Sequence, residues 1–281
     1  LEGNLQEAAH ITELILKKSP DYGPGHLRLG LIHRAAGEKE LAFKAFQQAL
    51  EMHPDKVGIL HTAVNMYLAD NEPDEALLII KKYASFVDER QQALIEHLKG
   101  KVFFKKGKED TAKRYCRQAI QKDPDYLPAY MTLADILIFK KQYSQASNLY
   151  KKVLNVRPDH IPALMATAYI HQIRDDIQTA QEIYRKVLSL SPGHVNALNN
   201  LAFILSETEQ GVDEALNLIN QARIKKPKDP YILDTLGWVY FQKGSYKSAV
   251  SELKESLSAD SNNPSAHYHI GLALYQLKEF E

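Results

Sequence analysis

The chain has 281 residues, and its 35 Lys and Arg balance 35 Asp and Glu, so the formal net charge at pH 7 is zero. A neutral chain lacks the global field that would hold it on nucleic acid, which argues against a nucleic-acid partner. No apolar run approaches the roughly 18 residues of a spanning helix, and Leu1 to Lys18 lacks the ordered regions of a signal peptide. We therefore expect no direct membrane insertion.

The prolines set a repeating register along the chain. One set follows the last turn of predicted second helices at spacings of 34, 70, 34, 34 and 35: Pro20, Pro54, Pro124, Pro158, Pro192 and Pro227. Another set lies where the next first helix begins: Pro24, Pro128, Pro162, Pro230 and Pro264. Pro73 opens a second helix. Because no proline interrupts a predicted helix, the pattern indicates helix pairs that recur about every 34 residues.

Small residues keep the same register and mark where helices approach closely. On first helices they are Gly30, Gly100, Ala134, Ala168, Ala202, Gly237 and Gly271. On second helices they are Ala8, Ala42, Ala76, Ala112, Ala146, Ala180, Ala215 and Ala249. A large side chain at these places is expected to cost roughly 1 to 3 kcal/mol by overpacking.

The stretch from Asp229 to Asp260 shows the unit most completely. Apolar residues recur at helical spacing before and after a turn at Lys243 and Gly244. With Gly237 and Ala249 at the packing positions, the unit resembles the tetratricopeptide repeat, a helix-turn-helix of about 34 residues. The resemblance implies an all-α fold, a right-handed superhelical solenoid.

The register divides the chain into a single array. The expected units are a half-repeat 1–20, full repeats 21–54, 55–88, 89–124, 125–158, 159–192, 193–227 and 228–261, and a half-repeat 262–281. Two places depart from the pattern. The junction from Ser85 to Gln92 suggests a longer or bent helix, and an extra residue between Ser206 and Ala215 suggests a lengthened turn.

Nothing in the sequence indicates catalysis, a cofactor or a metal site. His267 and His269 are two residues apart on a predicted helix and so do not share a face, whereas His33 and His171 occupy packing positions. Cys116, the only cysteine, falls in an apolar stripe and is interpreted as a core residue. No phosphate-binding loop, nucleophile elbow or HExxH motif is present. We therefore expect a protein that is not an enzyme.

In tetratricopeptide-repeat proteins the first helices line a concave groove, and the register carries the groove positions over to this chain. The N-terminal candidates are Arg28, Arg34, His61, Asn65, His97, Lys101 and Lys105. The middle candidates are Met131, Thr132, Asp135, Met165, Tyr169 and Gln172. The C-terminal candidates, expected to dominate binding, are Asn199, Asn200, Phe203, Asp234, Thr235, Trp238, Phe241, Tyr268, His269 and Tyr275.

The C-terminal set has two interpretations. Aromatic anchors beside amide side chains are typical of peptide binding, but these aromatics could instead only pack between adjacent first helices. The basic stretch from Lys101 to Arg114 is either a surface for an acidic partner or a solvated loop. The Lys/Asn clamp of chaperone-binding family members does not occur across three adjacent repeats, which argues against chaperone tails.

The resemblance implies a non-enzymatic scaffold that binds a peptide or protein segment in the groove. The C-terminal third, LAFILSETEQGVDEALNLINQA followed by DTLGWVYFQKG, also resembles long bacterial repeat proteins of envelope and exopolysaccharide-export systems. That second resemblance implies the alternative function, a structural assembly element of a bacterial secretion apparatus. It favours the periplasm or envelope over the cytoplasm without excluding either.

The two ends supply only half-repeats. Leu1 to Lys18 reads as a second helix and Pro264 to Phe280 as a first helix, and neither has a polar cap. We therefore expect a fragment of a longer repeat protein, whose copies associate end to end by completing a repeat between molecules.

Overall fold

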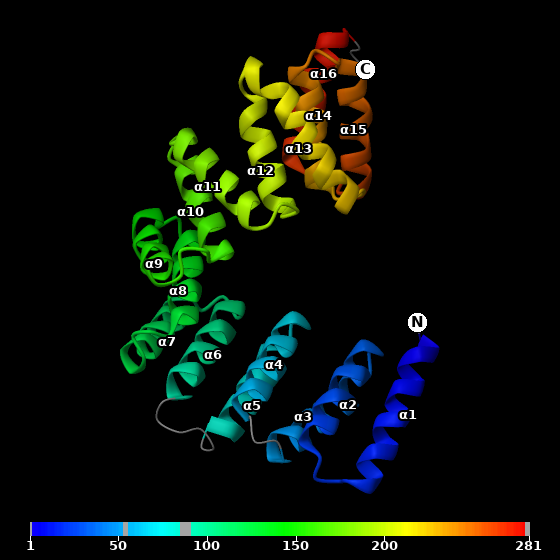
Figure 1. The fold of residues 1–281 in the computed structure, drawn as a ribbon, viewed down its shortest axis with the longest axis vertical. Helices are drawn as coiled ribbons and strands as arrows, with labels where there is room; N and C mark the ends of the chain where they lie inside the picture. Colours follow the sequence, from blue (N-terminus) through cyan, green and yellow to red (C-terminus); the bar gives the residue numbers. More distant parts are fainter. Residues whose placement is uncertain (1, 53–55, 85–90, 279–281) are drawn as a thin grey trace. The chain divides into compact units, whose positions relative to one another are not determined.

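The computed structural model describes residues 2–52, 56–84 and 91–278. Within these ranges it contains sixteen α-helices, one short 3-10 helix between two of them, and no strand (Figure 1). The predicted all-α fold, a solenoid of tetratricopeptide-type helix pairs, is therefore confirmed. The repeat boundaries drawn from the prolines remain a proposal.

The chain forms two compact units, residues 1–149 and 150–281, which are described separately. The first unit contains α1 (Glu2–Lys18), α2 (Gly23–Ala35), α3 (Lys39–Met52), α4 (Lys56–Ala69), α5 (Pro73–Tyr83), α6 (Gln92–Lys105), α7 (Glu109–Lys122) and α8 (Leu127–Phe139). The limit between the units falls within α9 (Tyr143–Val156).

The second unit continues the alternation of first and second helices. It contains α10 (Ile161–Ile173), α11 (Ile177–Leu190), α12 (Val195–Ser206), η3 (Glu209–Gly211), α13 (Val212–Lys225), α14 (Pro230–Gln242), α15 (Tyr246–Ala259) and α16 (Pro264–Leu277). Even-numbered helices are first helices, and odd-numbered helices are second helices.

Within each unit, first helices pack on neighbouring second helices: in the first unit α6 contacts α7 and α5. In the second unit α14 contacts α15 and α13, and it also lies beside the first helices α12 and α16. The small residues of the register make this packing close. A Cβ on Gly100 would lie 2.7 Å from Cys116 Sγ, and a Cβ on Gly237 would lie 2.5 Å from Leu253 Cγ. Glycine is therefore needed where these helices cross.

Local chemistry sets the helix ends. Asp229 caps α14 by accepting from the backbone N–H groups of Tyr231 and Ile232, and Pro230 takes the first helical position, where its missing N–H leaves no bond unmade. After α14 the chain turns at Gly244, whose φ of +75° is a left-handed conformation that favours glycine. The predicted turn at this position is confirmed.

The two irregular places have different outcomes. Most of the junction from Ser85 to Gln92 lies outside the described residues, between the end of α5 at Tyr83 and the start of α6 at Gln92. The extra residue after Ser206 forms the 3-10 turn η3, as the prediction of a lengthened turn required. A Cβ on Gly211 would lie 2.2 Å from the carbonyl oxygen of Leu205, so this turn accepts only glycine there.

Candidate functional site

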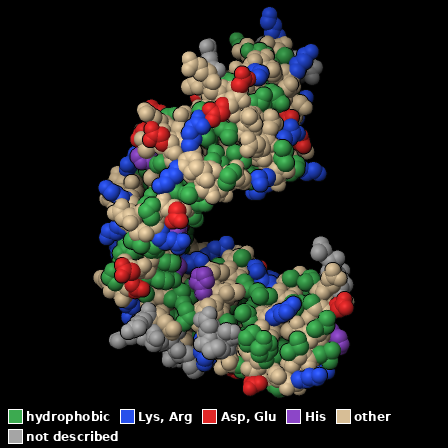
Figure 2. Space-filling view, in the orientation of Figure 1, with side chains coloured by type: hydrophobic (Ala, Val, Ile, Leu, Met, Phe, Trp, Pro, Cys, Tyr) green, Lys and Arg blue, Asp and Glu red, His purple; other side chains and the backbone are tan. Residues whose placement is uncertain are grey.

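The candidate site is the surface formed by the groove positions of the first helices, called here the first-helix surface. In the first unit it is carried by α4, α6 and α8, which contact one another in sequence. In the second unit it is carried by α12, α14 and α16, which do the same. Figure 2 shows acidic and basic side chains interspersed on the visible face of each unit, so neither sign of charge dominates that face.

In the first unit five polar side chains from three helices form the Lys101 cluster: His61, Asn65, His97, Lys101 and Thr132. The Lys101 ammonium donates to the amide oxygen of Asn65, whose amide nitrogen lies 3.2 Å from His61 Nδ1. On the other side, His97 Nε2 lies 2.9 Å from Thr132 Oγ1. The structure therefore joins residues that the sequence predicted one helix at a time.

Burial controls the charge of the Lys101 cluster. His97 is 3% exposed, and its burial, with smaller contributions from Lys101 and His61, lowers its pKa to about 3. Burial, and then Lys101, lowers the pKa of His61 as well. Burial also lowers the pKa of Lys101. At neutral pH both histidines are thus neutral, because charging either one would place a second cation beside Lys101 in a partly desolvated position.

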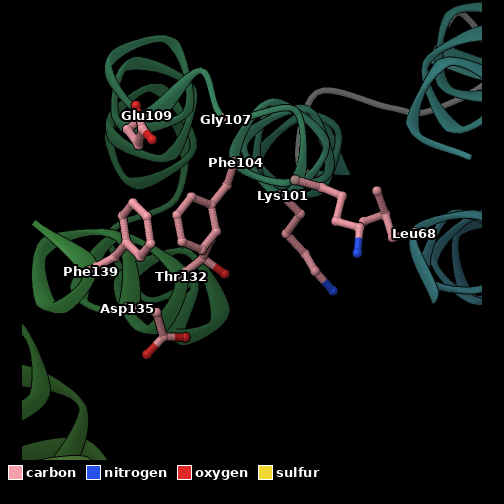
Figure 3. A pocket seen from close by; sticks show the side chains of 9 residues that line it. Leu68, Lys101, Phe104, Gly107, Glu109, Thr132, Asp135 and Phe139 are labelled. Atoms are coloured by element: carbon pink, nitrogen blue, oxygen red, sulfur yellow. The ribbon is translucent and has the colours of Figure 1, made fainter. Parts of the chain in front are cut away.

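A pocket of about 510 Å³ adjoins the Lys101 cluster (Figure 3). Phe104 of α6 and Phe139 of α8 meet edge to face there, with ring centroids 5.8 Å apart. Lys101 lies on the side of Phe104 away from Phe139 (Figure 3). Asp135 of α8 also lines the pocket. The pocket is lined by Leu68, Lys101, Phe104, Lys105, Gly107, Glu109, Thr132, Asp135 and Phe139.

In the second unit a chain of hydrogen bonds runs across three helices. Tyr184 donates its hydroxyl to Gln172 at 3.2 Å and accepts from the amide of Asn200 at 3.1 Å. Asn200 in turn accepts from the amide of Asn199 at 3.2 Å. The Asn199 amide oxygen is buried without a hydrogen-bond partner. Such an atom gains from any donor that reaches it.

The aromatic side chains of α14 and α16 form a stack. The Trp238 ring lies 4.3 Å from that of His269 and 5.0 Å from that of Phe241, and both pairs are nearly parallel. The indole N–H of Trp238 donates to a Glu207 carboxylate oxygen at 2.6 Å. His269 Nδ1 lies 2.8 Å from an Asp234 carboxylate oxygen. Trp238 is half-buried, and it contacts α16 through His269 and the turn after α12 through Glu207.

The remaining predicted residues differ in how accessible they are. Asp234, Thr235 and His269 are buried. Those that are half-buried are Arg34, Met131, Thr132, Met165, Gln172, Asn199, Asn200, Phe203 and Phe241. Those that are exposed are Arg28, Lys105, Asp135, Tyr169, Tyr268 and Tyr275. Tyr268 and Tyr275 expose 65% and 64% of their surface, so they are the open aromatic side chains of the C-terminal set.

Several residues of these clusters were absent from the predicted set. Tyr126 and Tyr184 complete the two hydrogen-bond networks, and Glu207 holds Trp238. Phe104 and Phe139 form the aromatic wall of the pocket. Both phenylalanines stand in the last turn of a first helix, 35 residues apart, and that recurrence was the available signal.

Two histidines outside the Lys101 cluster pair with nearby carboxylates. His33 Nδ1 lies 2.6 Å from Glu38, and His171 Nδ1 lies 2.8 Å from Asp176, each bridging a first helix to the turn that follows it. In the described ranges no three His, Cys, Asp or Glu side chains gather as metal ligands would. Nor does any helix in these ranges have the length and apolar character needed to cross a membrane.

Comparisons with known proteins agree with this architecture. Family models described as tetratricopeptide repeat match residues 26–56, 103–169 and 173–238, and one described as TPR repeat matches residues 237–278. No protein in the curated collection matches the sequence significantly.

Solved structures with the same fold share little sequence with this chain. Yeast Tom70 is 17% identical with a TM-score of 0.67, over 99% of this chain and 60% of the Tom70 chain. A tetratricopeptide repeat protein from Parabacteroides merdae ATCC 43184 is 13% identical with a TM-score of 0.60, over 90% and 98%. YrrB, a TPR protein with an unusual peptide-binding site, is 15% identical with a TM-score of 0.52, over 67% and 96%. The chain belongs to the tetratricopeptide-repeat family.

Proposed function

We propose that this chain is a non-enzymatic scaffold that binds a peptide or protein segment on its first-helix surface, with the second unit as the dominant site. The observation that carries the proposal is the pair of exposed tyrosines Tyr268 and Tyr275 on α16, the helix whose His269 stacks on Trp238. Tyrosine offers a large contact area with few rotatable bonds and a hydroxyl that finds a partner, and it is enriched at binding surfaces. The peptide-binding site of the fold relative YrrB supports the same reading.

The amide side chains of α12 supply the polar part of such a site. Asn199 and Asn200 are half-buried there, and an amide side chain can donate to and accept from the backbone of an extended segment. Tyr268 and Tyr275 would then cover apolar side chains of that segment. Asp234 and His269 hold each other below the surface, so we assign them to support of the stack instead of direct contact.

The test is a pull-down from native host extract, followed by cross-link mapping of the captured protein. We expect cross-links on α12, α14 and α16, and we expect Tyr268→Ala with Tyr275→Ala to weaken capture about tenfold or more, as loss of aromatic anchors does at interfaces. The matched control is Ile224→Ala on α13, which removes an apolar side chain that is 80% exposed on a second helix. Equal capture by the tyrosine variant would reject the site.

Trp238→Ala is a less selective probe of binding. Its ring is stacked between Phe241 and His269 and bonded to Glu207, so truncation also removes contacts within the fold. Its effect on capture is interpretable only beside its effect on the melting temperature.

The alternative function is an assembly element of a bacterial envelope or exopolysaccharide secretion apparatus. It predicts a different cross-link pattern in the same experiment. Such an element would use the edges and ends of the array, so its cross-links would fall on second helices, including α1 at the N-terminal end, and would be absent from α12 and α14. Cross-links confined to those elements would favour this alternative over the scaffold with a first-helix site.

A further proposal concerns self-association through the end helices α1 and α16. Each second helix has one side chain that lies seven residues after the small residue of the register. This side chain is at most 2% exposed in α3, α5, α7, α9, α11, α13 and α15. In α1 the equivalent residue, Ile15, is 45% exposed. On α16, a Cβ on Gly271 would meet nothing within 4 Å, unlike one on Gly237. Each end thus offers the packing face that the other lacks.

A further inference from the structure

The lysines around α6 and α7 differ in how their charges are met. Lys99 pairs with Glu96 at 3.1 Å, Lys113 pairs with Asp110 at 2.8 Å, and Lys106 pairs with Asp74. The Lys101 ammonium donates instead to the neutral amide of Asn65. Across the described part of the chain, neither Lys101 nor Lys105 is in an ion pair.

The position of Lys101 makes this lack of a counter-charge costly. Its side chain is half-buried among Asn65, His61 and His97, and both histidines are neutral at pH 7. A cation held out of water is destabilised unless a carboxylate or comparable acceptor faces it, because an amide dipole replaces only part of its hydration. A bound carboxylate would supply that missing charge.

The neighbouring pocket adds an apolar requirement. Phe139 is 66% exposed, and it forms a wall with Phe104 at 5.8 Å. The lining also holds Glu109 and Asp135, which lie on opposite sides of the two rings in Figure 3. A carboxylate is therefore favoured beside Lys101, and the two rings favour an aromatic side chain next to it.

We propose that the Lys101 cluster and its pocket bind an extended segment of a protein partner that carries an acidic side chain close to an aromatic side chain. The carboxylate lies between Lys101 and Lys105, and the aromatic ring packs on Phe104 and Phe139. The inference rests on the proposed function, because it takes the partner to be a protein segment on the first-helix surface. It adds a second site with its own chemistry, in the first unit.

A displayed library of random twelve-residue peptides, selected on the intact chain, tests the inference. We expect enrichment of peptides with Asp or Glu within a few residues of Phe, Tyr or Trp. Lys101→Met keeps the length of the side chain and removes its charge, so it should lower the affinity of a synthesised selected peptide about tenfold or more, the usual scale for a lost charge-assisted hydrogen bond. Phe139→Ala should remove the preference for aromatic residues.

Controls keep the outcomes distinct. Lys254→Met, at an exposed lysine of the second helix α15, should bind like the parent chain. If Lys101→Met is misfolded by circular dichroism, Lys105→Glu replaces it, because that exposed position tolerates the change and repels the same carboxylate. Selected peptides that lack acidic residues, or that bind Lys101→Met unchanged, would overturn the inference. If those peptides still lose affinity with Tyr268→Ala and Tyr275→Ala, the proposed function stands; selection of no peptide at all would reject both.

Discussion

At the scale of single residues, the buried polar side chain of His97 shows how a contact between two helices is specified. His97 makes polar contacts with Thr132 and with Tyr126, whose ring also packs edge to face against it. These contacts join α6 to α8, because Tyr126 is the N-cap residue of α8 and Thr132 lies within it. A purely apolar residue would bury as much area without fixing which helices meet.

His97 predicts a loss of stability in acid. Its pKa is about 3 in the folded chain and about 6.5 when the chain is unfolded, so the unfolded chain binds the extra proton between these values. Stability contributed by neutral His97 is therefore present above pH 6.5 and is lost as pH falls toward 3. At pH 4.5 the loss is roughly 2 to 3 kcal/mol. Amide hydrogen exchange of α6 at pH 7 and pH 4.5 measures it.

The comparison between variants isolates this histidine from other titrating groups. His97→Gln should show a smaller pH dependence in α6 than the parent chain, since glutamine does not titrate. His10→Gln, at an exposed position of α1, should leave that dependence unchanged. Equal pH dependence in the parent chain and in His97→Gln would contradict the assignment.

At the scale of helices, the sequence predicted what local chemistry decides. Pro230 opens α14 and Gly244 turns the chain after it, because a missing N–H and a positive φ act within a few residues. Contacts between repeats were harder to predict. Trp238 bonds to Glu207 across 31 residues, and that carboxylate comes from the irregular turn before η3. No local sequence pattern indicates whether the Trp238 ring is accessible to a partner or stacked on other side chains of the fold.

The same limit explains the outcome for the polar candidates. Register placed Asn65, His97 and Lys101 on first helices, and the structure brings them together in one cluster. The register did not indicate that His97 would be buried or that the Lys101 ammonium would donate to Asn65. Both features depend on how neighbouring helices are offset along their axes. Spacing along the chain thus identified the surface, while accessibility required the packed helices.

Two glycines at one register position test the packing of first on second helices. A Cβ on Gly237 would lie 2.5 Å from Leu253 Cγ and 3.3 Å from the backbone oxygen of Ala249. Gly237→Ala should therefore destabilise the chain by roughly 1 to 3 kcal/mol through overpacking. Gly271→Ala meets open space and should instead stabilise α16 by up to about 1 kcal/mol, because alanine is the better helix former.

Thermal unfolding followed by circular dichroism distinguishes the two substitutions. The sequence change is the same in both variants, and both glycines lie in first helices, so helix propensity cancels in the comparison. A lower melting temperature for Gly271→Ala than for Gly237→Ala would show that the crossing of α14 and α15 is not as close as described.

At the scale of the whole molecule, α1 and α16 are the end helices that we propose to join copies of this chain. On α1 the side chains of Ile11, Leu14 and Ile15 are 45 to 51% exposed along one face. On α16 the exposed packing position is Gly271. A second helix packs closely on its first helix where the first helix has a small residue at this register position. Leu253 of α15 packs in this way on Gly237 of α14. The face of α1 in one copy therefore complements the face of α16 in another.

This complementarity predicts head-to-tail association that increases with concentration. Sedimentation velocity over a rising concentration series should show a growing fraction of dimers and longer oligomers, since a heterologous contact between opposite ends is not closed by symmetry. Gly271→Phe fills the space that α1 would enter, and Ile15→Lys places a charge on the apolar face of α1; each should hold the chain as a monomer. Ile224→Lys, at an 80% exposed position on α13, should associate like the parent chain. A parent chain that stays monomeric throughout the series, or association that survives both end variants, would show that α1 and α16 do not complete a repeat between copies.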